Sequence, residues 1–142
     1  MDPAAFEEVI RELEPAACPF APALLSGCAG CSLAERHRVA EGERVTCPAP
    51  AHRDRCLQLR ARLREHSGFA LGLPDPEARL PHAKALRMLC GGLEGLAKTL
   101  ERGTGDVRGL VELLLAQHPG FEGLPWAAVM RTVSALPGRG RR

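Results

Sequence analysis

Five of the six cysteines of this 142-residue chain lie in one segment that has few apolar residues. Their spacing is C-x9-C-x2-C-x15-C-x8-C, and a proline directly follows the first and the fourth. The apolar residues between them show no sustained helical or strand periodicity. A segment of this length with so little core needs another source of stability. Sulfur can supply it, as thiolates on a metal or a cluster or as disulfides. These cysteines are Cys18, Cys28, Cys31, Cys47 and Cys56.

The rest of the composition predicts one soluble domain with reduced thiols. Charged residues make up 25% of the chain, and the net charge is +2. Four Phe, one Trp and no Tyr argue against a base-stacking surface for nucleic acid. No apolar run is long enough for a membrane span, and the acidic, amphipathic start at Met1 does not resemble an export signal. We therefore expect a cytoplasmic protein, in which thiolate ligation is favoured over disulfides.

Helical periodicity dominates outside the cysteine segment. Phe6, Val9, Ile10 and Leu13 form one apolar stripe near the start of the chain. A later helix is expected to turn Cys56, Leu59 and Leu63 toward the interior. Three more amphipathic helices follow, the longest of them over residues 81–102. The five helices are expected to begin at Pro3, at Pro50 or Ala51, at Pro81, after the capping residue Asp106, and at Pro125.

The cysteine segment itself is expected to be irregular. Residues 14–31 carry Pro and Gly and predict a loop. Ser32 and Glu35 have the capping-box spacing, which predicts a short helix from Leu33 to about Arg38. Weak alternation after it predicts a small hairpin turning at residues 41–42. The fold class is therefore all-α: about five helices in one domain, residues 1–136, with the binding segment 18–56 inserted after the first helix. Residues 137–142 predict a disordered basic tail.

Three glycines interrupt the longest predicted helix. Each costs ~1 kcal/mol of helix propensity, so we expect another element to approach this backbone closely. Cys90 lies among leucines of the same helix and is interpreted as a small buried core residue. In the connection before that helix, we expect Phe69, Leu71 and Leu73 to pack inward. The three glycines are Gly91, Gly92 and Gly95.

Four thiolates can hold either a tetrahedral zinc ion or an iron–sulfur cluster. Zinc ribbons and fingers usually show two C-x2-C pairs, whereas only Cys28 and Cys31 have that spacing here. The two Cys-Pro pairs resemble iron–sulfur sites, where a proline after a ligand recurs. We therefore favour a cluster, most simply [4Fe-4S], over structural zinc, and both over thiol or disulfide chemistry.

The predicted ligands are Cys18, Cys31, Cys47 and Cys56, whether the group is a cluster or a metal ion. Cys28 is an alternative ligand, since a C-x2-C pair can supply two ligands or one. His52 lies between the last two predicted ligands and could replace a thiolate, as histidine does in Rieske-type centres.

The stretch from Ala17-Cys18-Pro19 to Cys56, together with LPHAKALRMLCGG over residues 80–92, resembles a group of small bacterial cysteine-containing proteins of iron–sulfur type. The resemblance covers most of the chain and implies no particular activity. It implies that Cys28 is a departure from the group's pattern. The cysteines shared with the group would be Cys18, Cys31, Cys47, Cys56 and Cys90.

Positive charge surrounds the predicted site. Between Glu35 and Glu65 there are eight arginines and five acidic residues. Cations favour an anionic thiolate cluster, and they could also dock an acidic redox or regulatory protein or a phosphate backbone. The leading hypothesis is an electron-transfer protein or a redox or oxygen sensor. The alternative is a structural zinc module that mediates protein or nucleic-acid contacts. An enzyme is not favoured, because the sequence has no nucleophile elbow, P-loop, dinucleotide fingerprint or H-E-x-x-H.

Overall fold

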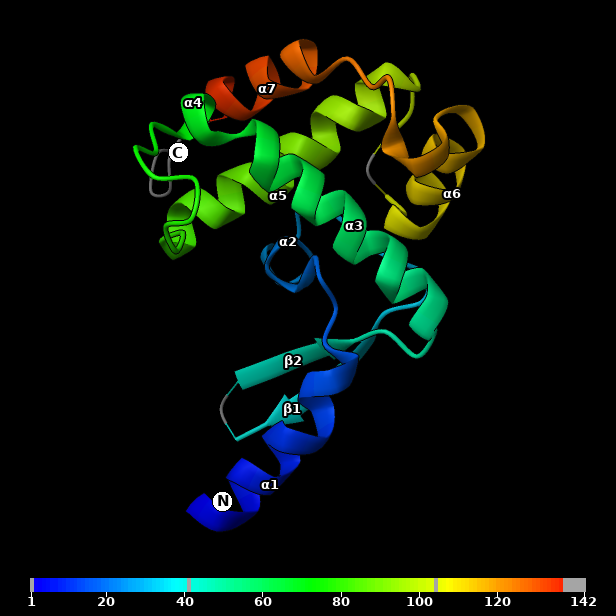
Figure 1. The fold of residues 1–142 in the computed structure, drawn as a ribbon. Coiled ribbons are helices and arrows are strands. Elements are labelled where there is room, and N and C mark those ends of the chain that lie inside the picture. Colours follow the sequence, from blue (N-terminus) through cyan, green and yellow to red (C-terminus); the bar gives the residue numbers. More distant parts are fainter. Residues whose placement is uncertain (1, 41, 104, 137–142) are drawn as a thin grey trace.

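The computed structural model describes residues 2–40, 42–103 and 105–136; the predicted tail at 137–142 lies outside them. Helices dominate the described chain, and one small hairpin lies to one side of them (Figure 1). The elements in chain order are α1 (Pro3–Leu13), the 3-10 turn η1 (Glu14–Ala16), α2 (Ala21–Ser26), β1 (Glu35–Val39), β2 (Gly42–Thr46), α3 (Pro50–His66), α4 (Gly68–Leu71), α5 (His82–Thr99), α6 (Val107–Gln117), the 3-10 turn η2 (Pro119–Phe121) and α7 (Trp126–Ala135).

Helix α5 is the centre of the core, and α7 lies along its glycine-bearing face. A Cβ atom on Gly91 would lie 2.7 Å from the Cα of Val133, and one on Gly95 would lie 3.0 Å from the Cα of Val129. On Gly92 it would lie 2.6 Å from the Leu63 side chain of α3. The close approach predicted from the three glycines is therefore confirmed. Figure 1 shows α3 crossing in front of α5 and α7 lying above it.

The fold is mostly helical rather than all-α. Among the described residues there are seven α-helices and a two-stranded antiparallel sheet. The sheet pairs Glu35 with Thr46 at one end and Val39 with Gly42 at the other, so the predicted hairpin is present. Gly42, which was expected in the turn, is instead the first residue of β2, and residue 41 lies outside the described residues. The predicted helix over 33–38 is wrong, because residues 35–39 form β1. Ser32 cannot cap a helix here, since its N–H and hydroxyl both donate to the carboxylate of Asp106.

The cysteine segment contributes more to the core than the sequence pattern indicated. Residues 14–31 were expected to form a loop, but they contain η1 and α2. Phe20, Ala23 and Leu24 are 1%, 0% and 3% exposed, and they occupy one turn of helix at i, i+3 and i+4. Gly27, at φ +85°, ends this helix in the left-handed conformation. The expectation of a segment without a core is therefore wrong.

The connection after α3 also differs from the prediction. Phe69 was expected to pack inward, yet its side chain is fully exposed. Residues 68–71 form the short helix α4, which buries Leu71 as expected, and Leu73 is partly buried against the core. Along the described residues, no helix combines the length and the apolar character that crossing a membrane requires.

Candidate metal or iron–sulfur centre

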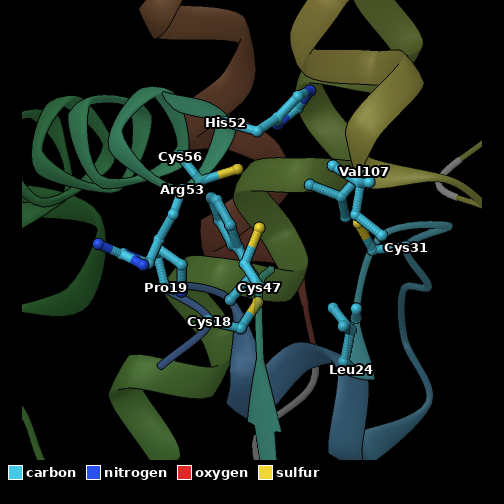
Figure 2. A pocket seen from close by; sticks show the side chains of 12 residues that line it. Cys18, Pro19, Leu24, Cys31, Cys47, His52, Arg53, Cys56 and Val107 are labelled. Carbon is cyan, nitrogen blue, oxygen red and sulfur yellow. The ribbon is translucent and has the colours of Figure 1, made fainter. Parts of the chain in front are cut away.

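Four cysteines line one pocket in the middle of the molecule. These are Cys18, Cys31, Cys47 and Cys56, the four predicted ligands, and all four carry free thiols. Figure 2 shows their sulfur atoms around a common space, with Cys56 reaching in from α3 and Cys31 from the opposite side. The thiols of Cys47 and Cys56 are buried, and those of Cys18 and Cys31 are half-buried.

Backbone pairing places Cys18 beside Cys47. The N–H of Cys18 donates to the carbonyl of Val45 at 2.9 Å, and the N–H of Cys47 donates to the carbonyl of Ala16 at 2.8 Å. The residues before Cys18 thus extend the hairpin at the end of β2, where Ala17 and Thr46 form an isolated bridge. The proline after each cysteine has no backbone N–H, so it cannot continue this pairing. Both segments therefore leave the sheet after their cysteine.

Cys56 is fixed by the packing of α3. It shares the buried face of that helix with Leu59 and Leu63, both 0% exposed. The predicted inward face of α3 is therefore confirmed. Because a helix holds its side chains in few rotamers, Cys56 is the least adjustable of the four.

Cys31 lies on an irregular loop that is tied to the start of α6. The carbonyl of Gly30 accepts a hydrogen bond from the N–H of Val107 at 2.7 Å. Ser32 donates to Asp106 through its N–H at 2.9 Å and through its hydroxyl at 3.2 Å. Burial works against the ionised carboxylate, but the hydrogen bonds from Ser32, together with those from the backbone of Arg108 and Gly109, prevail and lower the pKa of Asp106. Sequence analysis identified Asp106 only as a helix cap and missed its contact with this loop.

The remaining two cysteines form a disulfide. Cys28 and Cys90 are bonded, with their Cα atoms 5.9 Å apart. The structure thus places Cys28, the alternative ligand, away from the four free thiols and bonded to α5. Cys90 is buried in the core, as expected, and its bond also joins the cysteine loop to the central helix, which was not predicted. The sequence signal that could have suggested this pair was the even number of cysteines, which leaves two after four ligands are assigned.

The walls of the pocket are mostly apolar. Phe20, Leu24 and Val107 are buried there, so they limit the access of water to the thiols. His52 also lines the pocket, but its ring points toward α6, and its Nε2 lies 3.5 Å from a carboxylate oxygen of Glu112 (Figure 2). In this arrangement His52 does not face the sulfur atoms, so the structure does not support it as a replacement ligand.

Burial, and the closeness of the thiols to one another, disfavour the ionised form of Cys18 and Cys56 in the absence of a cation. Burial, with smaller contributions from the neighbouring Cys18, Cys31 and Cys47, raises the pKa of Cys56 from an ordinary 9.0 to about 12. Burial likewise raises the pKa of Cys18 to about 11, with contributions from Cys31 and Cys47, although a hydrogen bond from Phe20 and the charge of Arg60 oppose the rise. Cys18 and Cys56 therefore each lie within electrostatic reach of the other thiols.

The four thiols do not converge on a position for a single metal ion. Tetrahedral zinc holds its sulfurs at about 2.3 Å and therefore needs them within about 4 Å of one another. Across residues 2–40, 42–103 and 105–136, no three His, Cys, Asp or Glu side chains gather closely enough to hold one ion. A cluster binds each thiolate through a different iron, so its ligands need not meet at one point.

The enclosed space is smaller than a cluster. The cavity between the four thiols measures about 10 Å³, which is room for about one water molecule. Loading would therefore require the walls to separate. Cys18 and Cys31 are half-buried and lie outside the regular helices, so they have more freedom to move than Cys56.

The raised thiol pKa values predict that the metal-free protein is sensitive to alkali. In the unfolded chain these thiols ionise near pH 9, whereas in the folded chain Cys18 and Cys56 resist ionisation until about 11 and 12. The contribution of these two thiols to the free energy of unfolding should thus be fully present below pH 9 and should be lost as the pH rises from about 9 to about 12. The measurement is the urea midpoint of metal-free protein between pH 7 and about 11. A Cys18→Ser/Cys56→Ser double variant is the control, and it should lose less stability over the same range. Equal losses of stability in both proteins would contradict the assignment of the alkali sensitivity to Cys18 and Cys56.

Comparison with protein-family models, with curated proteins and with solved structures found no match to this chain. The resemblance to small bacterial cysteine-containing proteins thus remains a prediction, and any function must be argued from the cysteine pocket itself.

Proposed function

We propose that this protein binds an iron–sulfur cluster, most simply [4Fe-4S], through Cys18, Cys31, Cys47 and Cys56, and that it serves in electron transfer or redox sensing. One observation carries the proposal. Four free cysteines from three separate parts of the chain line one pocket, while the other two cysteines are bonded to each other. Clusters of this kind are bound by four cysteine thiolates, and here no other free cysteine could take the place of one of the four.

The chemistry of the pocket supports a bound cationic group. Four thiols that share a largely apolar pocket, two of them with a raised pKa, gain little from being together unless metal ions replace their protons. When bound, a cluster would supply one-electron oxidation and reduction. Phe20, Leu24 and Val107 would keep water from the sulfurs, and the nearby charge of Arg60 would favour the more negative, reduced state.

An electron-transfer role is favoured over an oxygen sensor by the burial of the pocket. Two of the four thiols are buried, and apolar side chains form most of the wall. Oxygen reaches such a site slowly, whereas electrons need only a short path from the surface. The half-buried thiol of Cys18 supplies this path, since Cys18 also lines an open surface groove.

The test is anaerobic purification followed by visible spectroscopy and by iron, sulfide and zinc analysis. We expect brown protein with a broad band near ~400 nm and about four iron and four sulfide per chain. Reversible bleaching by dithionite and recovery on reoxidation would support electron transfer, whereas irreversible loss of the band in air would favour sensing. Colourless protein with one zinc per chain would reject the cluster and favour the structural zinc module.

A further inference from the structure

The pocket thiols differ in how firmly the fold holds them. Cys56 is fixed by the packing of α3, and backbone pairing holds Cys18 beside Cys47. Cys31 lies instead on residues 27–34, here called the Cys31 loop, which joins α2 to β1 and reaches the pocket from the side opposite Cys56 (Figure 2). The enclosed space measures about 10 Å³, so a cluster can enter only if a wall moves. The Cys31 loop is the wall that is best placed to move.

Two kinds of anchor hold the Cys31 loop. On one side, Gly30 and Ser32 make hydrogen bonds with the start of α6. On the other side, the disulfide between Cys28 and Cys90 ties the loop to α5, three residues before Cys31. Hydrogen bonds at the surface break and re-form as the chain fluctuates, whereas a covalent bond does not. The disulfide therefore decides whether the loop can leave α5.

The disulfide is placed so that a reductant reaches one of its sulfurs first. Cys28 is half-buried and follows the exposed residues Ser26 and Gly27, whereas Cys90 is 9% exposed and lies within α5. A thiolate therefore attacks the Sγ atom of Cys28, and Cys90 is the leaving group. The Ser26 hydroxyl donates to the carbonyl of Ala23, and its oxygen lies 3.8 Å from the Sγ atom of Cys90. A rotation of this hydroxyl would stabilise the departing thiolate.

We propose that the bond between Cys28 and Cys90 is a redox gate on the cysteine pocket. While the bond is intact, the Cys31 loop stays against α5 and the pocket remains too small for a cluster. A dithiol reductant opens the bond, and the loop is then held by noncovalent contacts that can open locally. The inference rests on the proposed function, since it concerns how the same pocket is filled. The gate makes filling depend on the reducing conditions that also keep the four pocket thiols reduced.

Opening the gate consumes one dithiol per chain. One thiolate of the reductant attacks Cys28, which forms a mixed disulfide and releases Cys90 as a thiolate that takes up a proton. The second thiol of the reductant then attacks the reductant's sulfur in the mixed disulfide, and Cys28 leaves and is protonated. Two electrons pass from the dithiol to the protein, and the reductant departs as a disulfide. The four free thiols of the chain thus become six.

The first test is the rate at which each cysteine of the metal-free protein reacts with iodoacetamide in the absence of reductant, measured by peptide mass spectrometry. The wild type, with its bond intact, is compared with Cys28→Ser/Cys90→Ser. Cys31 should react at least ~10-fold faster in the double variant, because its loop can open locally. Cys56 should react at the same slow rate in both proteins, since α3 holds it. Equal Cys31 rates, or an equal increase at Cys56 that reports general loosening, would overturn the proposal.

The matched control is Ser32→Ala, which weakens the opposite anchor and leaves the disulfide in place. It removes the hydroxyl that donates to Asp106 at 3.2 Å and keeps the donation from the backbone N–H. Cys31 in this variant should react close to the wild-type rate, because the covalent anchor is unchanged. A rate as high as in the double variant would show that the contact with α6 closes the pocket, and it would overturn the proposal.

The second test is the rate of filling with ferrous iron and sulfide under anaerobic conditions, followed at ~400 nm. Cys28→Ser/Cys90→Ser should fill at least ~10-fold faster than the wild type. Sulfide can itself open a disulfide, so the free thiols of the wild type are counted after acid quenching at the same times. Filling should follow the appearance of two additional thiols per chain. Filling of the wild type with its bond intact would overturn the gate. If neither protein fills although the Cys31 rates differ, the proposed cluster fails and the release of the loop does not.

Discussion

Replacing Cys56 with serine is expected to abolish cluster binding. Cys56 projects from the buried face of α3, where Leu59 and Leu63 fix the helix, so no neighbouring residue can shift to take its place. We expect the iron content per chain to fall at least ~10-fold, together with the ~400 nm band, because even second-shell changes at metal sites cost 10-fold or more. Iron and sulfide analysis of anaerobically purified variants is the measurement. Cys18→Ser, Cys31→Ser and Cys47→Ser should each lose or destabilise the cluster.

The matched control for these variants is the double replacement Cys28→Ser/Cys90→Ser. It removes two sulfurs at once and leaves no odd thiol, yet it leaves the four pocket thiols in place. This protein should still bind the cluster. Loss of the cluster from the double variant, with retention in Cys31→Ser, would show that Cys28 is the ligand and that the disulfide is not formed in the working protein.

The helical part of the fold could be predicted because its apolar stripes are long. The inward residues of α3 follow the 3.6-residue period over several turns, and their burial is confirmed. Helix α2 could not be found in this way, because its six residues provide a single turn of pattern next to prolines. The stretch after Ser32 was misassigned for a different reason. Its capping-box spacing is local, whereas Asp106, which binds Ser32, is remote in sequence.

The sequence singled out the four cysteines that line the pocket but not their surroundings. The two Cys-Pro pairs and the helical position of Cys56 led to the four cysteines that line the pocket. The bond between Cys28 and Cys90 could not be read from the sequence, since connectivity does not follow from spacing. The expected compartment also argued against any disulfide. Arg60, which affects the pKa of Cys18, was one of eight arginines and had no distinguishing pattern.

Removing the bond between Cys28 and Cys90 is expected to lower the free energy of unfolding by roughly 2–4 kcal/mol. The two cysteines are 62 positions apart, so the bond shortens a long loop in the unfolded chain. It also joins the loop before Cys31 to α5. The measurement is urea unfolding of metal-free Cys28→Ser/Cys90→Ser followed by circular dichroism. With a slope of about 1–3 kcal/mol per molar urea, the midpoint should fall by about 0.7–4 M.

Two comparisons decide whether the bond itself is responsible for this loss. Wild-type protein treated with a dithiol reductant should unfold at the midpoint of the double variant, and alkylation should then count two additional thiols per chain. Metal-free Cys31→Ser is the matched control, because it removes a sulfur three positions away without opening any bond, and its midpoint should stay close to that of the wild type. If reduction leaves the midpoint unchanged, the loop is held by Phe20, Leu24 and the Ser32–Asp106 contact alone. In a reducing compartment the bond would open, so the loop that carries Cys31 would there depend on these contacts and on the bound cluster.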